Sequence, residues 1–145
     1  MRISGITLLA ALVAIGCGPT DSAAPAPEAA TLSSINETIF LPKCTTACHS
    51  GGSEVAAGGL DMQGDPRAAM LDVPATAVPC TGAGQKRLVA GDPEASLLYT
   101  KVASKAAGQE PPCGEGMPLG ADRPALSAAE LEQLRAWIAD GASDD

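Results

Sequence analysis

The sequence predicts a small all-α domain of about four short helices joined by long loops. Helix-start signals recur along the chain, in which serine or aspartate is followed by glutamate three residues on or directly by proline. Apolar residues follow these signals at helical spacing, and no segment alternates strongly enough to predict a strand. Glycine and proline are concentrated between the signals, where they predict long loops of the kind that wrap a ligand or carry function.

The first two expected helices lie in the N-terminal half of the domain. The first begins at Ser34, which can form a capping box with Glu37, and Pro42 is expected to end it. The second begins at Asp65-Pro66, an N-cap followed by a proline at the first helical position. The apolar residues of these helices are Ile35, Ile39, Met70 and Leu71.

The third and fourth expected helices lie in the C-terminal half. The third begins at Asp92, again followed by proline, and Gly108 lies just beyond its expected end. The fourth begins at Ser127, which can form a capping box with Glu130, and Gly141 is expected to cap its C-terminus. Their apolar residues are Leu97, Leu98, Val102, Leu131, Leu134, Trp137 and Ile138.

The N-terminal segment carries export signals rather than part of the domain. Arg2 precedes an apolar run over residues 3–15, which is too short to span a membrane and is typical of a secretory signal peptide. Small residues lead directly to Cys17, and this pattern resembles the signals of bacterial lipoproteins, in which the cysteine is acylated. An ordinary signal peptide cleaved elsewhere, with Cys17 incidental, is the alternative.

This interpretation divides the chain into a lipoprotein signal peptide (1–16), a lipid-attached flexible linker (17–32) and a folded domain (33–145). We expect an exported lipoprotein of the cell envelope that faces the periplasm and is anchored to a membrane through its lipid. Gly18, rather than an aspartate, follows the lipid cysteine. By analogy with lipoprotein sorting, this favours the outer membrane over the inner one.

The composition limits how the domain can be stabilised. Hydrophobic residues make up 46% of the chain, but alanine is prominent among them and there is one Phe, one Trp and one Tyr. A core with so few large side chains buries little area, so such a domain usually needs a disulfide, a metal or a large cofactor. Removal of Arg2 with the signal peptide moves the net charge from −8 to −9. This acidic balance argues against nucleic-acid binding, and solubility alone also explains it.

The strongest motif contains Cys44, Cys48 and His49, the only histidine of the chain, with three residues between the cysteines. Attachment sites for c-type haem have two cysteines with two residues between them, and a histidine directly after the second cysteine. The thiols bond the porphyrin edge and the imidazole binds the iron, so the adjacency of Cys48 and His49 is the stricter requirement. The extra residue leaves two alternatives open: a Cys44–Cys48 disulfide, or a copper site that adds Met117 to these ligands.

Further motifs follow in order. A helix with Ile39 leads into the cysteine motif, and a Gly-Gly-Leu-Asp-Met segment follows at 58–62. Then come Val-x-Gly-Asp-Pro-x-x-Ser-Leu-Leu at 89–98, a Gly-Met-Pro-x-Gly loop at 116–120, and a last Leu-Ser…Trp-Ile helix at 126–142. In this order the chain resembles the class I c-type cytochromes, and most closely the small bacterial cytochrome c-like domains of exported proteins.

The resemblance implies a cytochrome c-like fold in which short helices and long loops wrap one covalently bound haem c. It implies that Cys44 and Cys48 form the thioethers, and that His49 and Met117 are the axial ligands of the haem iron. It also implies that the last helix crosses the first. Both axial positions of the iron are then filled, so the expected function is one-electron transfer with redox partner proteins.

The sequence offers more than one methionine as the second axial ligand. Met117 lies in a loop of glycine and proline, which is a poor place for core packing and favours a ligand role. Other methionines in reach are Met62 and Met70. The chain has no second histidine and no triad or phosphate loop, so an electron carrier is expected rather than an enzyme.

Cys80 and Cys113 are expected to form a disulfide, because they are left over in an oxidising compartment. The bridge would close a loop of about 30 residues, which stabilises on the order of 3 kcal/mol. Without haem, two interpretations remain: a binding or structural lipoprotein held by disulfides, and a copper-binding lipoprotein. The copper ligands would be Cys44, Cys48, His49 and Met117.

The expected disulfide ties the loop before the third helix to the loop of Met117. Reducing the Cys80–Cys113 bond while the thioethers stay intact should therefore weaken the iron–methionine absorbance band. The measurement is the ferric absorbance spectrum before and after mild reduction and reoxidation of the iron. An unchanged band would show that the disulfide does not hold the methionine.

Overall fold

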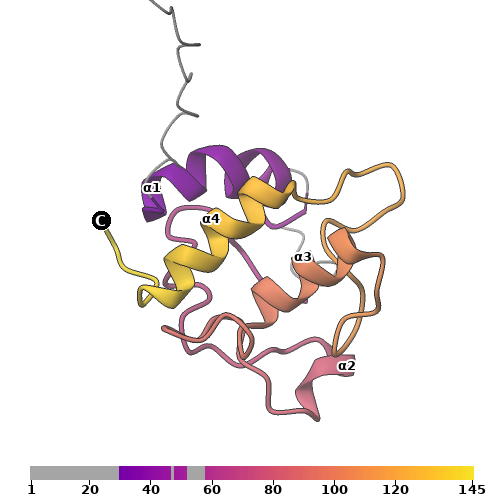
Figure 1. The fold of residues 1–145 in the computed structure, drawn as a ribbon. Helices are drawn as coiled ribbons and strands as arrows, with labels where there is room; N and C mark the ends of the chain where they lie inside the picture. The colour runs from indigo at the N-terminus through magenta and orange to yellow at the C-terminus, as the bar shows by residue number, and fades with distance from the viewer. Residues whose placement is uncertain (1–29, 47, 52–57) are drawn as a thin grey trace, which may run out of the picture.

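The computed structural model describes residues 30–46, 48–51 and 58–145, and it confirms the all-α prediction over those ranges (Figure 1). Within them, pairing of extended segments is confined to isolated β-bridges. The expected signal peptide, Cys17 and most of the linker lie outside the described residues. The described helical part begins at Leu32, one residue before the expected domain boundary.

The first helix starts earlier than predicted. α1 (Leu32–Ile35) is capped by Thr31, whose backbone is extended and whose hydroxyl accepts from the N–H of Ser34 at 3.2 Å. Ser34 lies inside the helix, and its hydroxyl donates back to the Thr31 carbonyl at 3.1 Å. The predicted capping box between Ser34 and Glu37 is therefore wrong, because a threonine one turn upstream takes the capping role.

The helix also continues past Pro42, where it was expected to end. α1 runs directly into η1 (Asn36–Thr45), a π-helix in which hydrogen bonds span five residues. The spacing continues beyond it, since the N–H of Thr46 donates to the Leu41 carbonyl at 3.3 Å. Proline ends an α-helix because it lacks the N–H and crowds the carbonyl four residues earlier. In the wider turn of a π-helix each N–H pairs with the carbonyl five residues earlier instead of four. η1 extends through Pro42 to the cysteine motif.

The second predicted helix is only a turn. Asp65 does cap it, since its carboxylate accepts from the N–H of Ala68 at 2.8 Å. After one turn the chain leaves the helical path, because Leu71 pairs with Leu88 in an isolated bridge. A short helix that was not predicted, α2 (Val78–Thr81), lies in the segment where a loop was expected.

The third helix begins later than predicted and ends where expected. Asp92 caps only a turn, its carboxylate accepting from the N–H of Ala95 at 2.9 Å. The buried hydroxyl of Ser96 donates to the Asp92 carbonyl at 2.8 Å, and α3 (Leu97–Ala107) starts after it. Gly108 ends α3 in the left-handed conformation with φ of 65°, which glycine adopts without strain.

The fourth helix confirms its prediction. α4 (Ala128–Ala139) is capped by Ser127, and the capping box is complete: Glu130 N–H donates to the serine hydroxyl at 3.3 Å. The carboxylate of Glu130 accepts from the N–H of Ser127 at 2.7 Å and from Lys43 Nζ at 2.6 Å. Gly141 follows the helix with φ of 97°. The Lys43 contact ties the start of α4 to η1.

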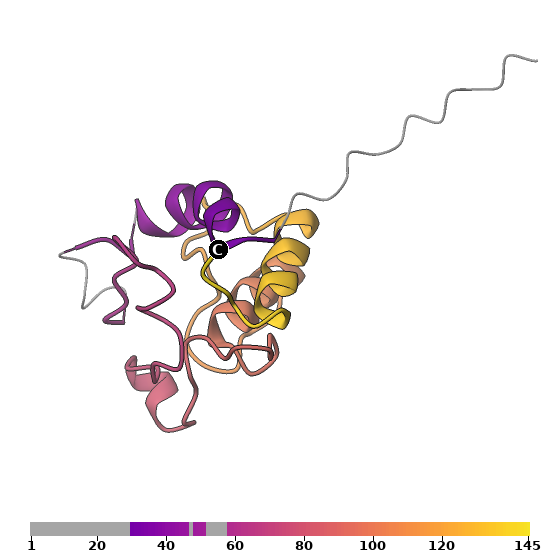
Figure 2. The ribbon, with the colours of Figure 1, turned by 90° about the vertical axis from the view of Figure 1, so that its left-hand side faces the viewer.

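The core lies where α4 packs against α1, η1 and α3 (Figure 1). The rings of Phe40 and Trp137 meet edge to face with centroids 6.2 Å apart, and both side chains are buried. Ile35, Leu134 and Ile138 complete this contact. Much of the segment 58–90, including α2, lies to one side of α3 and α4 (Figure 2). Its end joins the helices, because the carbonyls of Lys86 and Arg87 accept from the N–H groups of Leu97 and Leu98 at the start of α3. The helices and this segment form two sides of the molecule, and the candidate site lies between them.

Glu130→Gln should lower the free energy of unfolding at neutral pH by about 1 kcal/mol, because it removes the ion pair with Lys43. Burial raises the pKa of Glu130, but hydrogen bonds from Lys43 and Ser127 lower it. The lowering is larger than the rise, so the folded-state pKa lies below the ordinary 4.5. The stabilisation is therefore complete above about pH 5 and is lost as the pH falls through the folded-state pKa. Urea unfolding at a series of pH values measures this.

The matched control is Glu132→Gln, an exposed glutamate on the same helix. It should leave the free energy of unfolding nearly unchanged at each pH. A difference between Glu130→Gln and the unsubstituted protein that stays constant down to about pH 3 would contradict the role given to the Lys43–Glu130 pair.

Candidate functional site

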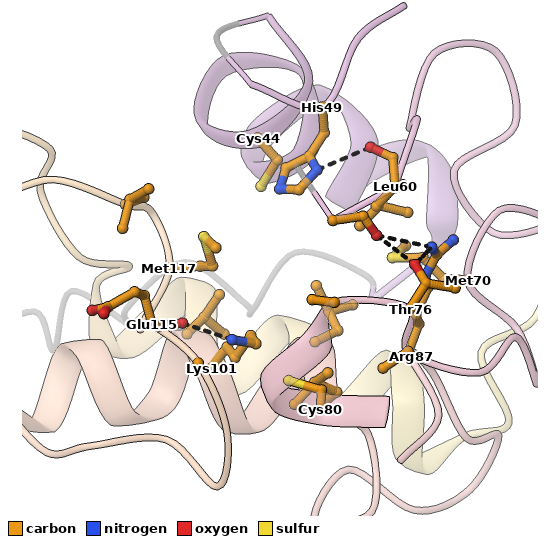
Figure 3. Close-up of a pocket in the computed structure, with 18 of the residues that line it drawn as sticks. Cys44, His49, Leu60, Met70, Thr76, Cys80, Arg87, Lys101, Glu115 and Met117 are labelled. Atoms are coloured by element: carbon orange, nitrogen blue, oxygen red, sulfur yellow. Dashed lines mark hydrogen bonds between the residues drawn. The ribbon is translucent and has the colours of Figure 1, made fainter. Parts of the chain in front are cut away.

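A cavity of about 290 Å³ opens between the helices and the segment 58–90 (Figure 3). This volume is close to the lower end of ligand pockets, about 300–1,000 Å³. Its walls come from the end of η1, the loop around Leu60, α3 and the loop before α4. Most of the lining is apolar, and the polar groups include one histidine and the side chains of Arg87 and Lys101. Such a cavity suits a mostly apolar ligand with a few directed contacts.

His49 reaches the cavity because the chain turns sharply after η1. The carbonyl of Cys44 accepts from the N–H groups of both Cys48 (3.3 Å) and His49 (3.1 Å). The second of these bonds spans five residues and continues the wide spacing of η1. The turn therefore brings His49 back toward Cys44 although three residues separate the cysteines.

The imidazole of His49 is held in one orientation. Its Nδ1 lies 3.0 Å from the carbonyl oxygen of Leu60. Because a carbonyl oxygen can only accept, Nδ1 carries the proton, and Nε2 is left with a lone pair. Burial lowers the pKa of His49, and the positive charge of Arg87 adds to this, while the bond to Leu60 opposes it. The ring is therefore neutral at neutral pH, as a metal ligand must be.

The loop that holds this ring is itself fixed by Arg87. The guanidinium donates to the carbonyls of Gly59 at 2.9 Å and Gly58 at 3.3 Å, and to Ala69 at 3.1 Å. The N–H of Met62 donates to the His49 carbonyl at 2.8 Å. The segment that carries Leu60 is thus anchored on both sides of the histidine contact.

The two cysteines of the motif have different positions. Cys44 lines the cavity, whereas Cys48 is half-buried and is not among the lining residues. Burial raises the pKa of the Cys44 thiol to about 11, with Cys48 adding to the shift and Lys43 opposing it. Neither cysteine takes part in a disulfide, so the expected alternative of a Cys44–Cys48 bridge is not seen.

Met117 enters the cavity from the loop between α3 and α4. Figure 3 shows its thioether and the ring of His49 pointing into the same space from different segments. Met62 and Met70 also line the cavity, but they are 2% and 0% exposed and belong to the core. Met62 is hydrogen-bonded to the backbone of His49, so it lies on the histidine side. Met117 is therefore the methionine best placed to face His49 across the cavity.

The structure contains the predicted disulfide between Cys80 and Cys113, whose Cα atoms are 5.2 Å apart. It joins α2 to the loop that leads to Met117, and it packs with Ala75 and Leu97 in a small second cluster. Cys80 also forms part of the cavity wall. The bridge thus lies beside the site, as the sequence suggested.

Sequence reasoning missed the side chains that fix the backbone around the cavity. Arg87 holds the loop of Leu60, and Lys101 on α3 donates to the carbonyls of Cys113 and Glu115 at 2.8 Å each. These donors bind backbone carbonyls, which every residue has, so no motif marks them. The sequence offered one signal for these two residues. Arg87 and Lys101 both have apolar neighbours in the sequence, near the predicted start of the third helix.

Among the described residues, no group of three or more His, Cys, Asp or Glu side chains is placed to hold a metal ion. Within the same ranges, no helix is long and apolar enough to cross a membrane. Comparison of the chain with protein-family models, curated proteins and solved structures gave no match.

Proposed function

We propose that this protein is a single-haem c-type cytochrome that carries one electron at a time in the cell envelope. The observation that supports this most strongly is the pairing of His49 and Met117 across one apolar cavity. Cys44 lies in the wall of that cavity, beside the histidine. Imidazole with thioether is the ligand pair of the c-type cytochromes, and the sulfur raises the reduction potential.

The residues present fit a haem. Nε2 of His49 carries the lone pair because Nδ1 is bonded to the Leu60 carbonyl, an arrangement that ligating histidines commonly have. The cavity is mostly apolar, as the face of a porphyrin requires. Cys44 and Cys48 would hold the group covalently, and the wide turn between them keeps His49 next to Cys44 in spite of the extra residue.

The side chains around the cavity are suited to electron transfer. A haem held by two protein ligands to its iron would change its oxidation state without binding a substrate. His49 and Met117 would hold the iron, the first oriented by the Leu60 carbonyl and the second by its loop. The apolar side chains around them exclude water, so little has to rearrange when the charge changes. No enzymatic step is proposed.

The proposed fold is cytochrome c-like. The order of the elements supports it: a helix leads into the cysteine motif, and α3 and α4 flank the methionine loop. The packing of α4 against α1 and η1, through Phe40 and Trp137, supports it further.

We propose the same location as the sequence indicates, a lipoprotein attached through Cys17 to a membrane of the cell envelope, with the outer membrane favoured. The Cys80–Cys113 disulfide supports an oxidising compartment. The net charge of −8 supports redox partner proteins with a basic surface and argues against nucleic acid.

Copper binding is the second candidate, because four side chains with a thiol or thioether sulfur line one cavity. Thiol and thioether groups are soft donors that favour Cu(I). They belong to Cys44, Met62, Met70 and Met117. A lipoprotein that only binds a partner and is held by its disulfide is the third candidate.

Haem staining of the purified, exported protein on a denaturing gel should be positive, because only covalently attached haem survives denaturation. The Cys44→Ala, Cys48→Ala double variant should be unstained and should lose most of its helical circular dichroism, since the haem would supply much of the core. A colourless protein that binds copper would support the second candidate instead. Native-like circular dichroism in the double variant would refute the haem as the missing core.

Met117→Leu should abolish the long-wavelength iron–sulfur band of the ferric protein and lower its reduction potential, because leucine fills space but cannot bind iron. Met62→Leu and Met70→Leu are matched controls that should keep the band. Absorbance spectra of the three variants decide the matter. If one of the controls loses the band while Met117→Leu keeps it, the second ligand is misassigned.

A further inference from the structure

The loop that carries Met117 is attached to one face of α3 by two lysines. Lys101 Nζ donates to the carbonyls of Cys113 and Glu115 at 2.8 Å each. Lys105 Nζ donates to the Gly120 carbonyl at 2.8 Å. The two lysines are four residues apart on the helix, so their side chains lie on the same face.

The attachment points lie on both sides of Met117. Lys101 binds before the methionine and Lys105 binds after it. Between them the N–H of Met117 donates to the backbone carbonyl of Lys101 at 3.2 Å. The methionine backbone is thus fixed to α3 at its own position as well as at both flanks.

The loop lies directly on the helix, and two glycines make this possible. A Cβ at Gly116 would be 3.2 Å from Lys105 Cβ, and a Cβ at Gly114 would be 3.0 Å from Lys101 Nζ. Gly114 also has φ of 61°, which favours glycine. Small residues therefore allow both lysine heads to reach carbonyl groups rather than extend into solvent.

The disulfide gives a separate attachment. It fixes the loop at Cys113, four residues before Met117, whereas Lys101 also reaches Glu115, two residues before it. Bonds from an ammonium group to carbonyls are charge-assisted and are stronger than neutral ones. Loss of Lys101 would leave the Cys113 carbonyl, whose bond is partly buried, without this donor.

We propose that Lys101 is a positioning residue that sets the Met117 sulfur toward the haem iron, with Lys105 as the second attachment of the same loop. This inference rests on the proposed function. Lys101 would not touch the iron; it acts through the backbone carbonyls of Cys113 and Glu115, which precede Met117. A methionine whose loop is released spends more time away from the iron, above all in the ferric state, because a soft sulfur prefers ferrous iron.

The test uses the full, haem-loaded protein and three lysine variants. Lys101→Met keeps an unbranched apolar side chain and removes the donors, whereas Lys101→Arg keeps the charge and donors. Lys86→Met is the control, because Lys86 is exposed and pairs with Asp72 away from the loop. The readouts are the ferric iron–sulfur band, the reduction potential, and the affinity for added imidazole, which competes with Met117 for iron.

Lys101→Met should weaken the band, lower the potential and increase the affinity for imidazole about tenfold, the effect of one lost charge-assisted hydrogen bond. Lys101→Arg should restore most of each readout, and Lys86→Met should match the unsubstituted protein. If Lys101→Met does not fold by circular dichroism, Lys105→Met replaces it, with changes in the same direction expected.

Two failures are distinguishable. If the unsubstituted protein carries no haem, or if its band does not depend on Met117, the proposed function fails. If the haem and the Met117-dependent band are present but the folded lysine variant equals the control in all three readouts, only the positioning role of the lysines is overturned.

Discussion

The contact between the His49 ring and the Leu60 carbonyl is the interaction on which the site depends. It joins the turn after η1 to the segment 58–62, and both contribute residues to the cavity wall. It also decides which ring nitrogen keeps its lone pair. Arg87 holds the accepting loop in place through two neighbouring carbonyls, so the orientation of the imidazole is set from outside the motif that contains it (Figure 3). The same loop returns a bond from Met62 to the histidine backbone.

The sequence predicted those helices whose start and stop signals have no nearby competitor. The capping box at Ser127 and the glycine after α3 are of this kind, and both are present. The 65–71 segment has the predicted cap but only one turn, because Leu71 pairs with Leu88 and Asp72 takes a φ of 56°, which a right-handed helix does not allow. Pro42 failed as a stop signal because the proline rule assumes four-residue hydrogen bonds, and this helix uses five.

For the site, the sequence singled out Cys44, His49 and Met117, and the structure has all three in the wall of one cavity, while their roles as ligands stay predictions. Cys44 and His49 belong to one short motif and share one turn, and Met117 stood out because its loop offers no core. Lys101 and Arg87 could not be predicted in the same way, because their partners are backbone carbonyls whose positions depend on the finished fold. The structure adds that Met62 and Met70 line the same cavity as Met117, with side chains that are buried in the core.

The basic side chains of the described residues are almost all bound to oxygen atoms of the protein itself. Seven of the eight basic residues in the described part of the chain donate to carbonyl groups or carboxylates. They are Lys43, Arg67, Lys86, Arg87, Lys101, Lys105 and Arg135. The long-range potential of the chain is negative because it carries 17 Asp and Glu residues against nine Lys and Arg residues. An oppositely charged molecule is drawn in from a distance of about one Debye length, ~8 Å at physiological salt, and this long-range attraction falls as ionic strength rises.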